Sequence, residues 1–142
     1  MIIDKFTGKY KFLSNFYLIP IEYEGVIYRS VEHAFQAAKT LDSKQRNIFR
    51  QCVTPADAKY CGRLIKLRDD WENVKDDIMY ELVKQKFNNI ELKDKLVATG
   101  NNLIIEGNNH GDCYWGVCNN VGENHLGRIL MRVRNEIKIE RQ

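Results

Sequence analysis

Glu32, Gln36 and Lys39 carry polar groups that could act together on a small molecule, because they recur at helical spacing. Positions i, i+4 and i+7 place a carboxylate, a carboxamide and an ammonium group in line on one face of an α-helix. The helix dipole favours an ionised carboxylate in the first turn, which suits a general base or a stabiliser of positive charge. The same pattern is also typical of a solvent-exposed face on which Glu and Lys only support the helix.

Cations and aromatic side chains elsewhere in the chain could hold an anionic or planar ligand. Arg63, Lys66 and Arg68 follow one another closely, and arginine forks match the oxygens of a phosphate. Cations at this density also commonly guard the exposed edge of a strand. An aromatic loop over residues 12–17 could offer a wall for stacking a ring, or it could belong to the core.

The helix that would position Glu32 is predicted to begin at Ser30, a residue type that caps helix N-termini. Apolar residues at i, i+3, i+4 and i+7 give this helix one buried stripe. The stripe is formed by Val31, Ala34, Phe35 and Ala38.

The remaining elements indicate an α+β fold, because a few short strands occur among many helices. We expect strands and turns over 9–28 with a tight turn at Glu24-Gly25, and a buried strand over 103–106. The chain shows no linker, repeat or low-complexity run, so residues 1–142 are predicted to form a single, mostly helical domain with a small sheet. Helices are expected over 43–52, 55–62, 69–87, 91–99 and from about 123 onward.

Length and composition are those of an ordinary globular domain of 142 residues. The formal net charge of +3 permits an anionic ligand but lacks the strong basic bias of an obligate nucleic-acid binder. No apolar run approaches the ~18 residues of a membrane span, and the first residues lack the layout of a signal peptide, so we expect a cytoplasmic protein with no membrane partner.

The four cysteines are expected to remain ordinary reduced thiols. Cys113 and Cys118 with His110 could make half of a metal site, but Cys52 and Cys61 offer no matching half. We therefore predict no metal and no cofactor.

Several short sequence blocks follow one another in a fixed order along nearly the whole chain. They are Phe12–Phe16, Val31–Lys39, Gly62-Arg63, Leu67–Trp71, Ala98–Gly100, Asp112–Gly116 and Asn124–Met131.

This ordered series resembles the NADAR family. The resemblance implies one α+β domain with N-glycosidase chemistry on ribosyl-phosphate or ADP-ribose compounds. Family members are associated with hydrolysis of phosphoribosylamino-pyrimidine intermediates of riboflavin synthesis, and others remove ADP-ribose from guanine bases of nucleic acid.

The chemistry of the residues is compatible with that implication. Cleavage of a ribosyl C–N bond passes through a state with positive charge on the sugar, which a carboxylate stabilises. We assign this role to Glu32. The second carboxylate is Asp112, for ribose hydroxyls or for the other half of acid–base catalysis, although Asp at this position could equally form an Asx turn.

The other expected site residues bind the substrate. Gln36, Lys39, Arg63 and Arg68 would meet phosphate or ribose oxygens, and Trp115 would stack on the base, although a tryptophan can also be core. The remaining expected contacts come from Asn15, Phe16 and Gly116.

The expected function is thus metal-independent hydrolysis of an N-glycosidic bond in a phosphorylated ribose conjugate. The substrate would be a small metabolite or ADP-ribose attached to DNA or RNA. A non-catalytic module that binds ADP-ribose or an NAD derivative is the alternative. His33, His110 and His125 are not expected to act as catalytic acids or bases.

Overall fold

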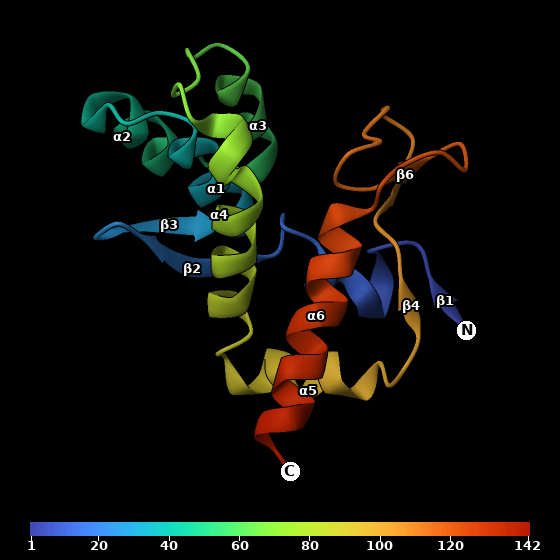
Figure 1. Ribbon diagram of the computed structural model, residues 1–142. Helices are drawn as coiled ribbons and strands as arrows, with labels where there is room; N and C mark the ends of the chain where they lie inside the picture. The colour runs from blue at the N-terminus through green and yellow to red at the C-terminus, as the bar shows by residue number, and fades with distance from the viewer. The chain divides into compact units, whose positions relative to one another are not determined.

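A computed structural model describes all residues from 1 to 142. It is an α+β structure with six α-helices, one 3-10 helix and three two-stranded ladders (Figure 1). In chain order the elements are β1 (Ile2–Ile3), the 3-10 helix η1 (Gly8–Leu13), β2 (Leu18–Tyr23), β3 (Val26–Ser30), α1 (Val31–Ala38), α2 (Ser43–Gln51), α3 (Pro55–Gly62), α4 (Trp71–Lys86), α5 (Ile90–Ala98), β4 (Leu103–Ile104), β5 (Gly107–Asn108), β6 (Val117–Cys118) and α6 (His125–Glu140).

The chain forms two compact units. The central unit consists of residues 15–86, and the terminal unit joins residues 1–14 to residues 87–142.

The central unit is organised around α1. Strands β2 and β3 form an antiparallel hairpin whose turn lies at Glu24 and Gly25, with φ angles of 48° and 87°. Two residues in succession with positive φ make the turn that matches the twist of a hairpin, which is the tight turn predicted from the sequence. The hairpin leads directly into α1, which packs against α2, α3 and α4 (Figure 1).

The helices of the central unit begin at side-chain caps. The hydroxyl of Ser30 accepts from the backbone N–H of His33 over 3.1 Å, as the sequence predicted. Asp42 caps α2 through the N–H groups of its first turn, and Thr54 caps α3 with Pro55 at the first helical position. These caps satisfy N–H groups that have no partner inside the helix, and they fix where each helix starts.

The terminal unit pairs α5 with α6 and contains two short parallel ladders, β1 with β4 and β5 with β6. Ile3 and Ile104 face each other in the first ladder and are fully buried. Where the sequence predicted one small sheet, the molecule has three separate two-stranded ladders. Each of the four strands in this unit is only two residues long, which is too short to recruit a third strand.

Two elements of this unit differ in extent from the prediction. The first residues of the expected strand-and-turn region form the 3-10 helix η1, which ends at Phe12 and Leu13 of the expected aromatic loop. Both of these side chains are buried in the core. The predicted strand over 103–106 is paired only at Leu103–Ile104.

Helix α6 begins at His125 rather than near residue 123, because Asn124 adopts a left-handed conformation with φ of 55°. The Asn124 side chain instead bridges other backbone groups, accepting from the N–H of Glu106 and donating to the carbonyl of Ile104. No helix in the structure is both long and apolar enough to cross a lipid bilayer.

Candidate active site

A hydrogen bond joins Glu32 and Gln36 on one face of α1. Nε2 of Gln36 donates to Oε2 of Glu32 over 2.8 Å, as expected for residues one helical turn apart. The backbone N–H of Glu32 donates to the carbonyl of Asn15 over 3.1 Å, which ties the first turn of α1 to the preceding loop. Glu32 is half-buried, so its carboxylate is held by protein contacts while remaining accessible.

Gln36 is almost fully buried, and its neighbours Glu32 and Gly62 fix the orientation of its carboxamide. Its Oε1 has no hydrogen-bond partner. A Cβ atom on Gly62 would lie 1.8 Å from this oxygen, so the absence of a side chain at the end of α3 makes the space that Gln36 occupies. Rotating the carboxamide would turn Oε1 towards the Glu32 carboxylate and replace attraction by repulsion.

Lys39 ends α1 on the same side as Glu32. Burial lowers the pKa of Lys39, and the nearby Glu32 carboxylate partly offsets this by favouring the charged ammonium. Three further cations lower the pKa of Lys39 through repulsion, namely Lys59, Arg63 and Lys75. Lys39 is thus close enough to one carboxylate and to three other cations for their charges to act on its ammonium group. This cluster is named the cation cradle below, and it comprises Lys39, Lys59, Arg63 and Lys75.

The cradle draws on three helices and the segment after α3. Lys59 lies on α3 and Lys75 on α4, where Lys75 also pairs with Glu72 over 2.5 Å. Reasoning from the sequence missed both lysines because no spacing rule relates separate helices. Their only signal in the sequence was their charge.

Arg63 and Arg68, expected to act as a pair, differ in their surroundings. Arg63 is exposed. The guanidinium of Arg68 instead forms a two-pronged ion pair with Asp70, in which Nε donates to Oδ1 over 2.6 Å and Nη2 donates to Oδ2 over 3.2 Å. This contact lowers the pKa of Asp70, and Arg68 also reaches the carbonyl of Ala38. Arg68 thereby fastens the end of α1 to the start of α4.

Asn15 and Phe16 precede the hairpin of the central unit. Asn15 is buried, and its Nδ2 contacts Sδ of Met79 at 3.4 Å. Phe16 is 39% exposed, so its ring is available for contact with a ligand. Asn15 therefore supports the start of α1, whereas Phe16 lies on the surface of the unit.

Asp112 and Trp115 belong to the terminal unit, in the loop between β5 and β6. Oδ1 of Asp112 accepts from the N–H groups of Tyr114 and Trp115, at 3.1 and 2.9 Å. This is the Asx-type turn that the sequence left open as an alternative to a catalytic role. The rings of Tyr114 and Trp115 meet edge to face at 5.0 Å, so the carboxylate organises an aromatic loop.

Gly116 allows two backbone segments to approach closely. A Cβ atom at this position would lie 1.8 Å from Oε2 of Glu106 and 2.1 Å from its carbonyl oxygen. Any side chain would collide with the backbone there. The expected ligand-binding glycine is thus also required for packing of the Trp115 loop.

The rings of His33 and His125 each contact other groups of the fold. The ring of His33 is buried between the Ser30 hydroxyl at 2.7 Å and the carbonyl of Cys52 at 3.0 Å. Burial lowers the pKa of His33, which favours the neutral ring. His125 stacks on Tyr114 with ring centroids 4.2 Å apart and contacts Glu123. No group of three or more His, Cys, Asp or Glu side chains is arranged to hold a metal ion.

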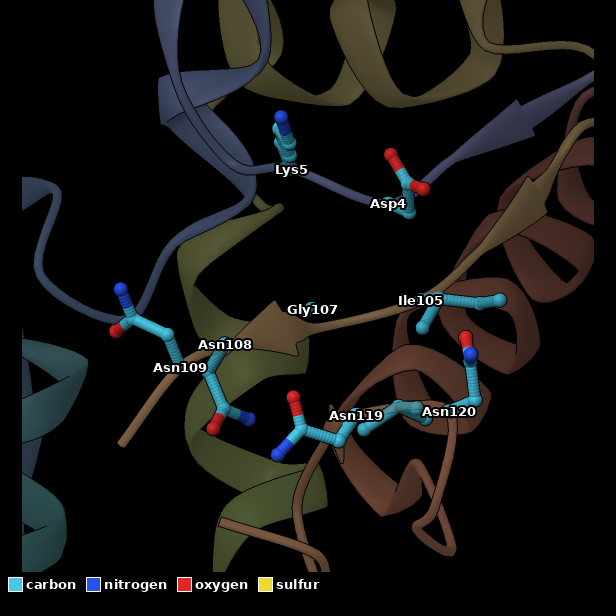
Figure 2. Close-up of a pocket in the computed structure, with 9 residues that line it drawn as sticks. Asp4, Lys5, Ile105, Gly107, Asn108, Asn109, Asn119 and Asn120 are labelled. Carbon is cyan, nitrogen blue, oxygen red and sulfur yellow. The ribbon is translucent and has the colours of Figure 1, made fainter. Parts of the chain in front are cut away.

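A polar pocket of about 480 Å³ in the terminal unit was not predicted from the sequence. Figure 2 shows its lining, drawn from the segment after β1, from β5 and from the turn after β6. Asn108 uses its carboxamide inside the loop, where it donates to Glu106 and to the carbonyl of Asp112. Asn119 and Asn120 form a left-handed turn, with φ of 52° and 63°. These asparagines thus shape the loops around the pocket.

The expected site residues therefore fall into two sets. The central unit brings together Glu32, Gln36, Lys39 and Arg63, with Arg68 as a fastening contact. The terminal unit brings together Asp112, Trp115 and Gly116 in one loop.

Comparison with known proteins gives consistent matches along the chain. The NADAR domain model matches residues 4–138. N-glycosidase YbiA from Shigella boydii serotype 4 is 38% identical over 139 residues, which is 95% of this chain and 86% of that protein. Riboflavin biosynthesis protein VVA0006 from Vibrio vulnificus is 36% identical over 89% of this chain but only 35% of its own length.

A solved structure shares the fold. The NMR structure of the E. coli protein YbiA superposes with a TM-score of 0.85 at 36% sequence identity, covering 99% of this chain and 87% of that one. The α+β architecture predicted from the sequence is therefore confirmed.

Proposed function

The chain belongs to the NADAR family, and on that premise we propose that it hydrolyses the N-glycosidic bond of a phosphorylated ribose conjugate. A relative with 38% identity over nearly the whole length is named an N-glycosidase, so the chain is a hydrolase acting on N-glycosyl bonds. The substrate and the roles of individual residues are the content of the proposal.

The observation that carries the proposal is the Glu32 carboxylate, which Gln36 orients and which acts on Lys39 of the cation cradle. A glycosidase of this kind needs a carboxylate for the sugar and cations for the phosphate. The central unit holds both within one cluster of helices.

Glu32 acts on the ribose in this mechanism. As the bond between C1′ and the base nitrogen breaks, its electron pair goes to the nitrogen and positive charge develops on the sugar. The carboxylate stabilises this charge and takes a proton from the water that attacks C1′. Gln36 keeps Oε2 of Glu32 in place, so the carboxylate needs little reorganisation during the reaction.

The cation cradle binds the phosphate of the substrate. Arg63 is exposed and can offer a two-pronged contact, while the half-buried lysines add point charges. Lys39 is the member of the cradle on whose charge Glu32 acts, so it is proposed to contact both the phosphate and a ribose hydroxyl. Arg68 contributes by holding the end of α1 through Asp70.

The substrate class is a phosphoribosylamino-pyrimidine. A relative named as a riboflavin biosynthesis protein favours this small metabolite. The modest net charge of +3 favours it as well, because binding to a polynucleotide usually relies on a larger positive charge. ADP-ribose attached to guanine in DNA or RNA is the competing substrate.

The remaining expected residues are proposed to contact the base or the ribose. In the terminal unit, Asp112 would act on ribose hydroxyls or protonate the leaving nitrogen, and Trp115 would stack on the base. In the central unit, Asn15 and Phe16 would complete the contacts. Gly116 would let the Trp115 loop adopt its shape.

The test compares release of base from a phosphoribosylamino-pyrimidine and from an ADP-ribosylated guanine oligonucleotide, followed by mass spectrometry. We expect release from the first and a loss of at least ~100-fold in kcat for Glu32→Gln with substrate binding retained. Glu91→Gln, which changes an exposed glutamate of the terminal unit, is the matched control and should keep full activity.

Other outcomes would redirect the proposal. Release only from the oligonucleotide, with strong dependence on salt, would assign the nucleic-acid substrate. Binding of ADP-ribose without release from either compound would identify a non-catalytic binding module and overturn the hydrolase. Full activity of Glu32→Gln would remove Glu32 from the mechanism.

A further inference from the structure

Cys52 and Cys61 lie side by side in the central unit, apart from the residues assigned to the reaction. Their Sγ atoms are 3.9 Å apart. Cys52 follows the last turn of α2 and Cys61 lies in the last turn of α3, and both thiols are free and partly exposed. The S–S bond of a disulfide is about 2.05 Å long. Rotations of the two side chains that move each sulfur atom by roughly 1 Å would bring the pair to this distance.

The backbone holds the two cysteines in this position. The carbonyl of Cys52 accepts from Nε2 of the buried His33 over 3.0 Å, so this residue is fastened to α1. Cys61 is fixed inside α3, and its neighbour Gly62 packs against Gln36 of α1. Both cysteines are therefore anchored to the same helix, and their approach does not depend on a flexible loop.

We propose that Cys52 and Cys61 form an oxidisable thiol pair that closes a reversible disulfide when the protein meets a peroxide. The thiolate of Cys61 attacks one oxygen of the peroxide, the O–O bond breaks, and the sulfur becomes a sulfenic acid as one water leaves. The sulfur of Cys52 then attacks that sulfenic sulfur, and a second water leaves. Two electrons pass from the two thiols to the peroxide, which is reduced to two waters.

The order of these steps follows from the surroundings of the two thiols. Burial and the neighbouring Cys61 raise the pKa of Cys52 to about 11, so Cys52 stays protonated at neutral pH. The Cys52 thiol also donates to the carbonyl of Ile48 at 3.3 Å, a contact that needs its proton. Cys61 is therefore assigned the first reaction with the peroxide, and Cys52 resolves the sulfenic acid.

The other two cysteines provide the internal comparison. Cys113 is exposed and Cys118 is buried, and neither is in contact with another thiol. Oxidation of Cys113 would lead to links between molecules, whereas the Cys52–Cys61 link forms within one chain.

The test treats the reduced full-length protein with hydrogen peroxide, blocks remaining thiols with N-ethylmaleimide and digests with trypsin. Cleavage after Arg50, Lys59 and Arg63 places the two cysteines on separate peptides, Gln51–Lys59 and Tyr60–Arg63. We expect these peptides as one linked species, about 2 Da lighter than their sum, which dithiothreitol separates.

Matched variants complete the test. Cys113→Ser should keep the linked species, while Cys52→Ser and Cys61→Ser should each abolish it. In Cys52→Ser the sulfenic acid of Cys61 should persist and react with dimedone. Absence of the linked species in the folded wild-type protein, or oxidation confined to Cys113, would overturn the proposal.

Discussion

The carboxamide of Gln36 donates a hydrogen bond of 2.8 Å to the carboxylate of Glu32, one turn earlier on α1. Because Gln36 is almost fully buried, the carboxylate has a rigid partner on the protein side and an accessible face on the other. A side chain that must act at a defined point on a sugar benefits from such a second residue.

Gln36→Leu is expected to lower kcat by about 10-fold to 100-fold, because a hydrogen bond to a charged group contributes about 1.5–3 kcal/mol. Leu has a similar volume, so the fold should persist. The measurement is steady-state release of base, with circular dichroism and thermal unfolding as the structural control. An unchanged kcat in a folded Gln36→Leu protein would show that Gln36 does not position Glu32.

Gly62→Ala is expected to lower the free energy of unfolding by about 1–3 kcal/mol. This loss is expected even though Ala has a higher helix propensity than Gly. The new methyl group would overlap with Oε1 of Gln36, which cannot move without losing Glu32. Urea unfolding measures the cost. In a Gln36→Ser background the same change should cost much less, since the clashing atoms are gone, and an equal cost in both backgrounds would contradict the steric explanation.

Arg63→Ala and Arg68→Ala should separate binding from structure. Arg63 is exposed and lies in the cation cradle, so its loss should raise KM about 10-fold while Tm changes by less than about 2 °C. Arg68 fastens α1 to α4 through Asp70 and the Ala38 carbonyl, so its loss should lower Tm. Kinetics and thermal scans of both variants check this, and the reverse pattern would exchange the two roles.

Lys86→Met is expected to stabilise the protein at neutral pH. Lys86 is 1% exposed, and burial lowers its pKa to about 7 from the ordinary value of 10.5. Between these values the unfolded chain binds a proton that the folded chain does not, so the stability contributed by this group rises with pH. Below about pH 7 the full cost of burying the charge remains, on the order of a few kcal/mol.

The gain from Lys86→Met should therefore be largest at pH 7 and below, and it should shrink as the pH approaches 10.5. Urea unfolding of both proteins across this range measures the difference. The ammonium group of Lys86 also lies 5.4 Å from the centre of the Tyr17 ring. The control is Lys84→Met, which changes an exposed lysine of the same helix and should have little effect on stability. A difference that grows with pH would contradict the assignment.

The sequence by itself determined the helix that carries Glu32. Ser30 is an N-cap residue, so it marks the start of the helix that follows it. The apolar stripe of α1 then determines which of its side chains face the core. The alignment of Glu32 with Gln36 follows from the same periodicity, because one turn of a helix has a fixed rise and rotation. The tight turn at Glu24-Gly25 was local for a similar reason.

Only the tertiary structure decided which charges accompany Glu32. Lys59 and Lys75 come from α3 and α4, and their approach to Lys39 depends on how those helices pack, which no spacing in the chain encodes. The same is true of the contact between Arg68 and the carbonyl of Ala38, and of the approach of Cys52 to Cys61. Local sequence sets the phase of each helix, but long-range packing selects which faces meet, and the cation cradle exists only after that choice.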